Sequence, residues 1–300
     1  MSPIERILAK LAARPAAPLH EAGVAEVVRG ALAEMGVPYA LDPFGNIIAH
    51  YQGGAPRVAF ALVAHMDHPG FEVARAGPGR SEAVVLGGVA SSGLSPGTRL
   101  RLCTPRGWTA APVVTLAPPR LDGRPPRFTF TAGEPVTPGD WGVWDLPDFE
   151  ERGEVLHLRA ADDLAGCAVM LTTMAELAAR GLPADVYGVF TRAEEIGLVG
   201  AALVAKRQAI PKTAIVISLE SSRQLPGAEL GKGPVIRTGD LRRTFDHEAE
   251  RYLHAGRDLL GQMEPPLPVQ RQLMYGGTCE ATPFSAFGYR ATGVALPLGN

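Results

Sequence analysis

Hydrophobic positions in the first fifty residues recur at helical spacing and then change to a continuous run. Residues 4–11 and 24–35 carry apolar side chains three and four positions apart, which predicts two amphipathic helices. Ser2 and Glu5 flank the start of the first helix in the order of a capping box. Residues 58–64, which follow Arg57, form an unbroken apolar run, which predicts a strand covered on both faces of a sheet.

The pattern changes between residues 71 and 150. Short β-like runs alternate there with turns rich in glycine and proline, and we find no helical period among them. Several short strands with close turns predict a small β-barrel or sandwich. We interpret residues 71–150 as a β domain inserted into a discontinuous domain of residues 1–70 and 151–300.

Alternating strand and helix patterns return after residue 150. The predicted strands are residues 154–159, 186–190, 213–218 and 291–296, and the predicted helices are residues 164–178, 199–207 and 245–260, with a last helix opening near residue 281. Strands that alternate with helices are typical of α/β proteins. We therefore predict a central mixed, mostly parallel sheet flanked by helices.

Composition narrows the classes of protein that this chain can represent. Twenty-nine basic residues against 31 acidic ones give a net charge of −2, which provides no attractive field for nucleic acid or an anionic membrane. No apolar run approaches the ~20 residues of a membrane span, and the start has no signal-peptide pattern. The three cysteines form no closely spaced pair. We expect a cytoplasmic protein with a substantial hydrophobic core.

Acids and a histidine follow several of the apolar runs. They are His65 with Asp67, Asp162 with Asp163, Glu194 with Glu195, and Glu220. Each group has an ordinary explanation, as a hydrogen-bonded histidine, a helix cap or a pair of surface charges. Because open α/β sheets bring the carboxyl ends of their strands together, the groups jointly predict a site for zinc, cobalt or manganese. An acid beside the metal can serve as a general base.

Six motifs, spread over nearly the whole chain, resemble one known family. They are HMDHPGF, ADDLAGC, TRAEEIGLVGA, SLE, LGKGPVI and GGTCEA. The chain resembles the glutamyl aminopeptidase and tetrahedral (TET) aminopeptidase family of co-catalytic metallopeptidases. The resemblance implies a zinc-exopeptidase-like fold that hydrolyses N-terminal residues of peptides. It also implies a homo-oligomer, formed as a dimer through the inserted domain and often built up to a dodecamer.

The resemblance further implies two divalent transition-metal ions per subunit, zinc, cobalt or manganese. The implied roles are His65 and Glu220 at the first ion, Glu195 at the second, Asp162 as the bridge, Glu194 as the general base and Asp67 as the partner of His65.

The chain departs from the family pattern at several positions. His68 replaces a glutamate, Leu164 stands where arginine is common, and Glu220 replaces an aspartate. The sequence printed ends at Asn300 and has no histidine beyond His254, although the family takes its last ligand from a histidine after the final strand. We therefore expect a second ion only if a histidine follows Asn300.

Three other functions compete with the aminopeptidase. A related amidohydrolase would deacylate amino acids or peptide-like amides at the same metals. A non-catalytic homologue would keep the fold and the assembly but lack a working second metal site. A glycosidase would use two carboxylates, but His65 among clustered acids fits a metal site better.

Overall fold

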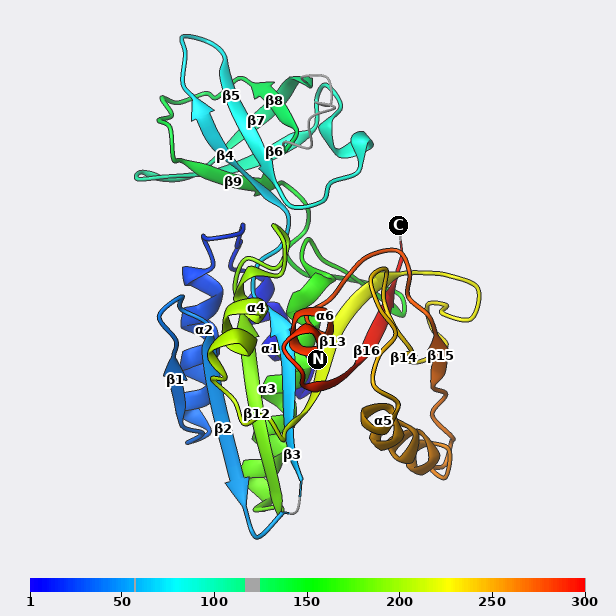
Figure 1. Cartoon of the computed structure of the whole chain (residues 1–300). Coiled ribbons are helices and arrows are strands. Elements are labelled where there is room, and N and C mark those ends of the chain that lie inside the picture. The colour runs from blue at the N-terminus through cyan, green and yellow to red at the C-terminus, as the bar shows by residue number, and fades with distance from the viewer. Residues whose placement is uncertain (57, 117–124, 300) are drawn as a thin grey trace.

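The computed structural model describes residues 1–56, 58–116 and 125–299 and shows two parts (Figure 1). Within these ranges, the larger part is an eight-stranded sheet flanked by helices, and the smaller part is a closed β-barrel beyond one end of that sheet. Among the helices of the described ranges, none combines the length and hydrophobicity that a membrane crossing requires.

The central sheet is mixed and mostly parallel. Its strands are β1 (Tyr39–Leu41), β2 (Ile47–Gly53), β3 (Ala59–His65), β12 (Ala184–Thr191), β13 (Ile215–Arg223), β14 (Val235–Arg237), β15 (Gln270–Gln272) and β16 (Arg290–Leu298). They hydrogen-bond in the order β1-β2-β12-β3-β13-β16-β14-β15. The pairs within β12-β3-β13-β16 and the pair β14-β15 are parallel, and the other three pairs are antiparallel. The predicted fold class is confirmed.

Helices cover both faces of this sheet (Figure 1). They are α1 (Pro3–Ala12), α2 (Ala22–Glu34), α3 (Ala161–Arg180), α4 (Val199–Arg207), α5 (His247–Leu260) and α6 (Ala281–Ala286). Along β3, Phe60 and Leu62 pack into the core that contains α1, α2 and α3. Ala61 and Val63, which point the other way, pack with α4 and α6. Burial on both faces explains why this strand appears in the sequence as a continuous apolar run.

The first helix begins as the sequence predicts. The Ser2 hydroxyl accepts a hydrogen bond from the Glu5 N–H at 3.3 Å, and the Glu5 carboxylate accepts one from the Ser2 N–H at 2.6 Å. This reciprocal pair satisfies amide donors that have no partner inside the helix.

The barrel has a hydrophobic interior of its own. Its strands are β4 (Gly70–Arg75), β5 (Ser81–Leu86), β6 (Arg99–Thr104), β7 (Gly107–Leu116), β8 (Arg127–Phe130) and β9 (Trp141–Trp144), closed in the order β4-β5-β8-β7-β6-β9, with a 3-10 helix at Ser91–Leu94. Phe71 contacts Phe128 and Trp144 edge-on at ring distances of 5.2 and 5.9 Å. Alternation along β4 and β5 places the apolar side chains inside the barrel.

The chain enters the barrel directly from the central sheet. Strand β3 ends at His65 and β4 begins at Gly70. A Cβ atom on Gly70 would lie 2.4 Å from the Cβ of Ala17, so glycine is required for this close approach. Beside it, His68 Nε2 accepts a hydrogen bond from the Ala16 N–H at 3.1 Å. The entry is therefore packed tightly against the segment after α1.

The return from the barrel differs from the prediction. Residues 154–159 were expected to form a strand, but only β11 (Val155–His157) does so, and it pairs with β10 (Glu150–Arg152) in a hairpin outside the main sheet. Its side chains are exposed, so the alternation there reflects no buried face. After the hairpin, the Arg159 guanidinium donates to the Ala12 carbonyl at 3.0 Å. The return is thus also fastened to the end of α1.

Candidate metal centre

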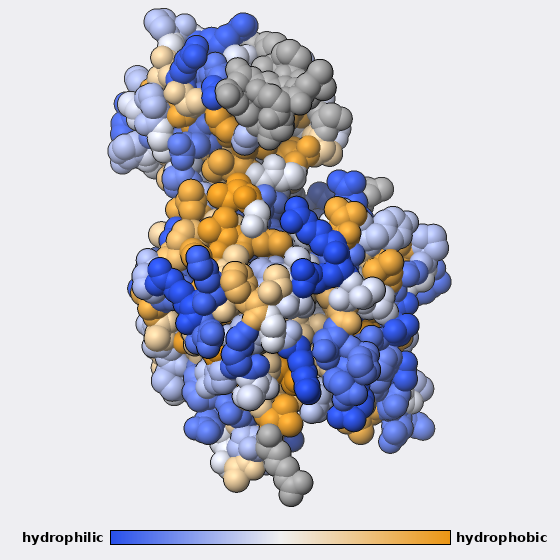
Figure 2. All heavy atoms as spheres, viewed as in Figure 1, coloured by the Kyte–Doolittle hydropathy of each residue, from blue (hydrophilic) through white to orange (hydrophobic). Residues whose placement is uncertain are grey.

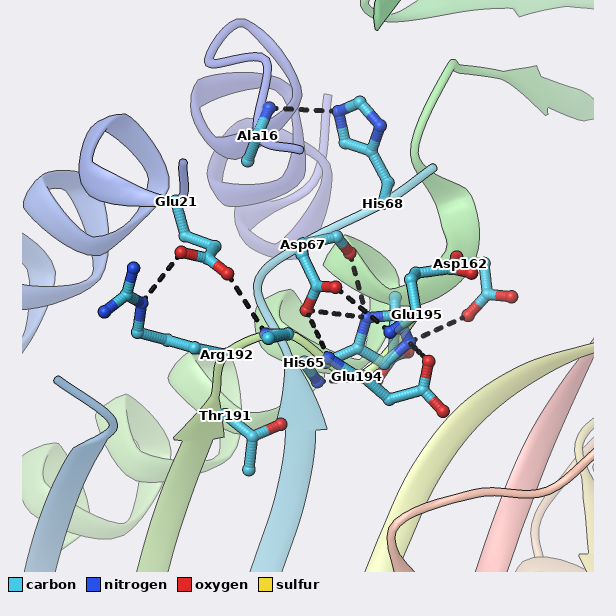
Figure 3. A network of polar contacts seen from close by, with 12 residues as sticks. Ala16, Glu21, His65, Asp67, His68, Asp162, Thr191, Arg192, Glu194 and Glu195 are labelled. Atoms are coloured by element: carbon cyan, nitrogen blue, oxygen red, sulfur yellow. Dashed lines mark hydrogen bonds and ion pairs between the residues drawn. The ribbon is translucent and has the colours of Figure 1, made fainter. Parts of the chain in front are cut away.

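The carboxyl ends of β3, β12 and β13 lie side by side and face the barrel (Figure 1). His65 is the last residue of β3 and pairs in register with Thr191, the last residue of β12. Strand β13 continues to Arg223, beyond the predicted end at residue 218, so Glu220 lies inside the strand. Asp162 approaches from the first turn of α3 (Figure 3).

One ligand atom from each of His65, Asp162 and Glu220 lies within 4.8 Å of the other two. The Nε2 atom of His65 is 3.2 Å from Asp162 Oδ1 and 3.9 Å from Glu220 Oε1. Asp162 Oδ1 is buried and makes no hydrogen bond with any described residue. One imidazole nitrogen and two carboxylate oxygens that converge in this way form a typical donor set for a transition metal.

The tautomer of His65 follows from its hydrogen bond. Its Nδ1 atom lies 2.8 Å from the backbone oxygen of Asp67, which can only accept, so Nδ1 carries a proton. In the neutral ring, the lone pair of Nε2 then points toward Asp162 and Glu220. Burial lowers the pKa of His65, but the charge of Glu194 and contacts with Asp162 and Glu220 raise it well above its usual value. The site therefore favours positive charge at Nε2.

Asp67 acts mainly on the neighbouring loop. Its carboxylate was expected to orient His65, but it lies 3.7 Å from Nδ1, and the backbone oxygen makes the hydrogen bond instead. The two carboxylate oxygens accept hydrogen bonds from the N–H groups of Glu194 and Glu195 at 3.0 and 3.1 Å (Figure 3). Asp67 therefore fixes the backbone from which both glutamates project.

Glu194 and Glu195 project differently from this backbone. Glu194 Oε2 lies 3.8 Å from His65 Nε2, so it borders the space among the three candidate ligands. Glu195 Oε2 instead accepts a hydrogen bond of 3.4 Å from the Gly88 N–H in the barrel. Burial raises the pKa of Glu195 to about 7. The structure thus groups Glu194 with His65, Asp162 and Glu220, and turns the carboxylate of Glu195 toward the barrel.

The two aspartates at the start of α3 have separate roles. Asp163 is fully buried, and its carboxylate accepts hydrogen bonds from the N–H groups of Gly166 and His65 at 3.2 and 3.3 Å. The bond to Gly166 is the capping interaction that the sequence predicts for one of the pair. Burial raises the pKa of both aspartates well above the usual value, and the charge of Glu220 adds to this shift.

Glu280 is a buried acid whose role the sequence did not reveal. It lies directly before α6 and accepts hydrogen bonds from the hydroxyls of Thr191 and Ser218 at 3.1 and 3.0 Å. Burial raises its pKa to about 7. Its motif, GGTCEA, is one of the six that resemble the family and opens the last predicted helix, but the sequence assigns Glu280 no role. One signal in the sequence could have indicated that Glu280 is buried: it is an acid at the start of a helix, and Cys279 and Ala281 on either side of it are apolar.

Arg237 is the second functional candidate that the sequence did not reveal. Its side chain is 2% exposed, and Nη1 lies 3.8 Å from Glu220 Oε2. Burial would raise the pKa of Glu220, but the neighbouring His65 and the charge of Arg237 outweigh it and hold that pKa below its usual value. Nothing in the short run that precedes Arg237 distinguishes it from a surface arginine.

Comparisons with known proteins agree with this arrangement. The model of the M42 glutamyl aminopeptidase family matches residues 131–297. The lysyl aminopeptidase of Pyrococcus furiosus is 30% identical, over 77% of this chain and 73% of that protein.

Solved structures share the fold. A TET aminopeptidase from a marine sediment archaeon of the Thaumarchaeota has a TM-score of 0.84 at 21% identity, over 99% of this chain and 89% of that one. The Pyrococcus horikoshii TET1 peptidase can assemble into a tetrahedron or a large octahedral shell. Its structure has a TM-score of 0.81 at 21% identity, over 98% of this chain and 91% of that one. This chain belongs to the M42 glutamyl aminopeptidase family and is a hydrolase of the peptidase class.

Proposed function

We propose that this protein is a metal-dependent aminopeptidase that removes N-terminal residues from peptides. Membership of the M42 family supports the reaction class, and its relative in Pyrococcus furiosus is named a lysyl aminopeptidase. The observation that carries the proposal is the convergence of ligand atoms from His65, Asp162 and Glu220 within 4.8 Å. Oδ1 of Asp162 is buried and makes no hydrogen bond with any described residue, so a bound cation would satisfy it.

The neighbouring residues support a role for each side chain. A zinc, cobalt or manganese ion held by His65, Asp162 and Glu220 would polarise the scissile carbonyl and acidify a water molecule. Glu194 borders the same space and would take the proton of the attacking water at a carboxylate oxygen, then deliver it to the leaving amine. Asp67 positions Glu194 because its carboxylate accepts a hydrogen bond from the backbone N–H of Glu194.

A second metal ion would share Asp162 and use Glu195. Although Oδ1 of Asp162 is buried, 36% of the side chain is exposed, so the carboxylate has another face for a further ion. Among the described residues, the carboxylate of Glu195 hydrogen-bonds only to the Gly88 N–H, at a long 3.4 Å, so turning toward a cation would cost little. We assign Asp162 as the bridge on these grounds.

The surface around the strand ends suits a peptide substrate. Figure 2 shows hydrophobic side chains gathered at the waist between the barrel and the larger part, with mostly hydrophilic surface below. The carboxyl ends of β3 and β12 face this waist (Figure 1). A peptide bound there would meet apolar surface beside the candidate ligands.

Replacing His65 tests the proposal directly. We expect His65→Ala to lose bound metal and turnover of aminoacyl anilides, because one of three converging ligand atoms is removed. His247→Ala is the matched control, since His247 is 88% exposed on α5 and should behave as wild type. Elemental analysis and turnover are measured after chelation and after adding back zinc, cobalt or manganese. Unchanged metal content and turnover in His65→Ala would refute the proposed site.

We further propose that residues 71–150 mediate self-association into a homo-oligomer, a dimer or a dodecamer. The barrel within this range has its own core, and its entry and return both contact residues 12–17. Ends that lie close together are typical of an inserted domain. Joining Gly70 to Glu154 by a short glycine linker should leave a smaller particle in light scattering. A particle with the wild-type number of subunits would contradict this role.

A further inference from the structure

The side chain of Arg237 extends across β16 toward the candidate metal centre. It is the last residue of β14, and it pairs with Gly293 of β16, the strand beside β13 (Figure 1). A Cβ atom on Gly293 would lie 3.3 Å from Arg237 Cδ and 3.1 Å from the Ser218 oxygen. A side chain larger than hydrogen would therefore crowd the arginine stem. Glycine at this position leaves room for the guanidinium to reach β13.

Two guanidinium nitrogens of Arg237 and one carboxylate oxygen of Glu220 are buried without a hydrogen-bond partner among the described residues. Nε and Nη1 of Arg237 are buried and make no hydrogen bond with any described residue. Glu220 Oε2 is also buried without such a bond, and it lies 3.8 Å from Nη1. Unpaired buried donors and acceptors are costly, and a small movement would join these two groups.

Other acids near Arg237 already have donors. Asp240 accepts hydrogen bonds from the N–H groups of Arg242, Arg243 and Cys279. Glu280 accepts from the hydroxyls of Thr191 and Ser218. Within the described ranges, Glu220 Oε2 is therefore the acid oxygen nearest to Arg237 that still needs a donor.

The two oxygens of Glu220 face different surroundings. Oε1 lies 3.9 Å from His65 Nε2 and accepts a hydrogen bond from the Ser221 N–H at 3.1 Å, whereas Oε2 lies 3.8 Å from Arg237 Nη1. We propose that Arg237 is a positioning residue that holds Oε2 of Glu220, so that Oε1 alone is presented to the metal beside His65 and Asp162. This role rests on the proposed metal site. Arginine suits it because its guanidinium is permanently charged and presents a planar set of donors.

A double-mutant cycle separates positioning from a general effect of charge. The variants are Arg237→Met, Glu220→Ala and the two combined, and the probe is cobalt(II) alone, followed by calorimetric titration and visible absorption. If Arg237 acts through Glu220, Arg237→Met binds cobalt about 10–100-fold more weakly than wild type, as is usual for partners of metal ligands. In the Glu220→Ala background, the same substitution should then change cobalt affinity by less than about threefold, because coupled residues are not additive.

The matched control is Arg271→Met. Arg271 lies on the neighbouring strand β15 and pairs with the buried Glu250 at 2.5 Å, away from the candidate ligands. We expect this variant to keep the wild-type cobalt affinity and absorption spectrum. Arg237→Met should instead alter the spectrum, because Glu220 is then free to offer both oxygens or neither.

Two results would overturn the role of Arg237. One is unchanged or tighter cobalt binding in Arg237→Met. The other is an equal loss with and without Glu220, which would make the arginine a general counter-charge. If Arg237→Met does not fold, Arg237→Lys keeps the charge without the planar donors and is taken through the same cycle. Equal cobalt binding by wild type and His65→Ala would instead refute the metal site itself, and with it this role.

Discussion

The barrel interior and the strand-end site are both buried, but different forces hold them. The barrel is filled by rings such as Phe71, Phe128 and Trp144, which contact one another edge-on. The site buries His65 and Glu220 with further acids around them. Apolar burial stabilises the first without regard to pH, whereas each charge in the second needs a partner or a cation. Substitutions in the barrel should therefore change the free energy of unfolding, whereas substitutions at the site should change metal binding and turnover.

The largest effect is expected at Glu194. Glu194→Gln should keep its metal but lose turnover by about 100-fold to 10,000-fold, which is typical for loss of a general base. Glu195→Gln, its neighbour, should instead lower metal occupancy, and excess metal should restore part of its rate. Elemental analysis and anilide turnover on both variants make the measurement. Near-wild-type turnover in Glu194→Gln would show that this residue does not transfer the proton.

A substitution in the barrel should lower the stability of the fold and leave the metal content unchanged. Phe128 is fully buried, and Phe128→Ala should lower the free energy of unfolding by about 3–5 kcal/mol through lost burial and a cavity. Glu134→Gln, in an exposed pair with Arg106, should change it by less than about 1 kcal/mol. Denaturant unfolding measures both. Metal content per folded molecule should be unchanged, and loss of metal in Phe128→Ala would contradict the separation of the two regions.

A third effect is expected at the junction between the two parts, and it depends on pH. Burial lowers the pKa of His68 from 6.5 to about 3, and the nearby charge of Arg159 adds to the shift. The unfolded state therefore binds an extra proton between these values, and stability falls as the pH drops from 6.5 toward 3 by up to about 1.4 kcal/mol per pH unit. His68→Gln removes this contribution, so its unfolding free energy should depend less on pH over that window.

The control for this experiment is His247→Gln, which replaces an exposed histidine. It should show the same pH dependence as wild type, because 88% of its side chain is exposed on α5, away from the connections to the barrel. If His68→Gln follows the wild-type curve between pH 6.5 and 3, then His68 is not held neutral in the folded protein.

Much of the fold could be predicted because its signals are local. The apolar run before His65 predicts a doubly covered strand, and the helix predicted for residues 199–207 matches α4. The ends of β3 and β12 place His65 and Glu194 for the same reason, since parallel strands bring such ends to one edge. Asp162 instead reaches the site from the first turn of α3, and Glu220 from inside β13.

The remaining features depend on contacts between distant parts of the chain. Arg237 reaches Glu220 because Gly293 leaves space on an intervening strand, and no spacing rule records that space. The direction of Glu195 depends on Gly88, which arrives from the barrel more than a hundred residues earlier. The length of β13 is set by pairing with β16 as far as Leu298, which extends it past its apolar segment.

The short segment after α1 has a consequence for any assembly of this protein. Ala17 contacts Gly70 at the entry to the barrel, Ala16 donates to His68, and Ala12 accepts from Arg159 at the return. The barrel is thus braced at both of its connections by one stretch of backbone. Subunits that meet through their barrels would then inherit a fixed orientation of their catalytic parts.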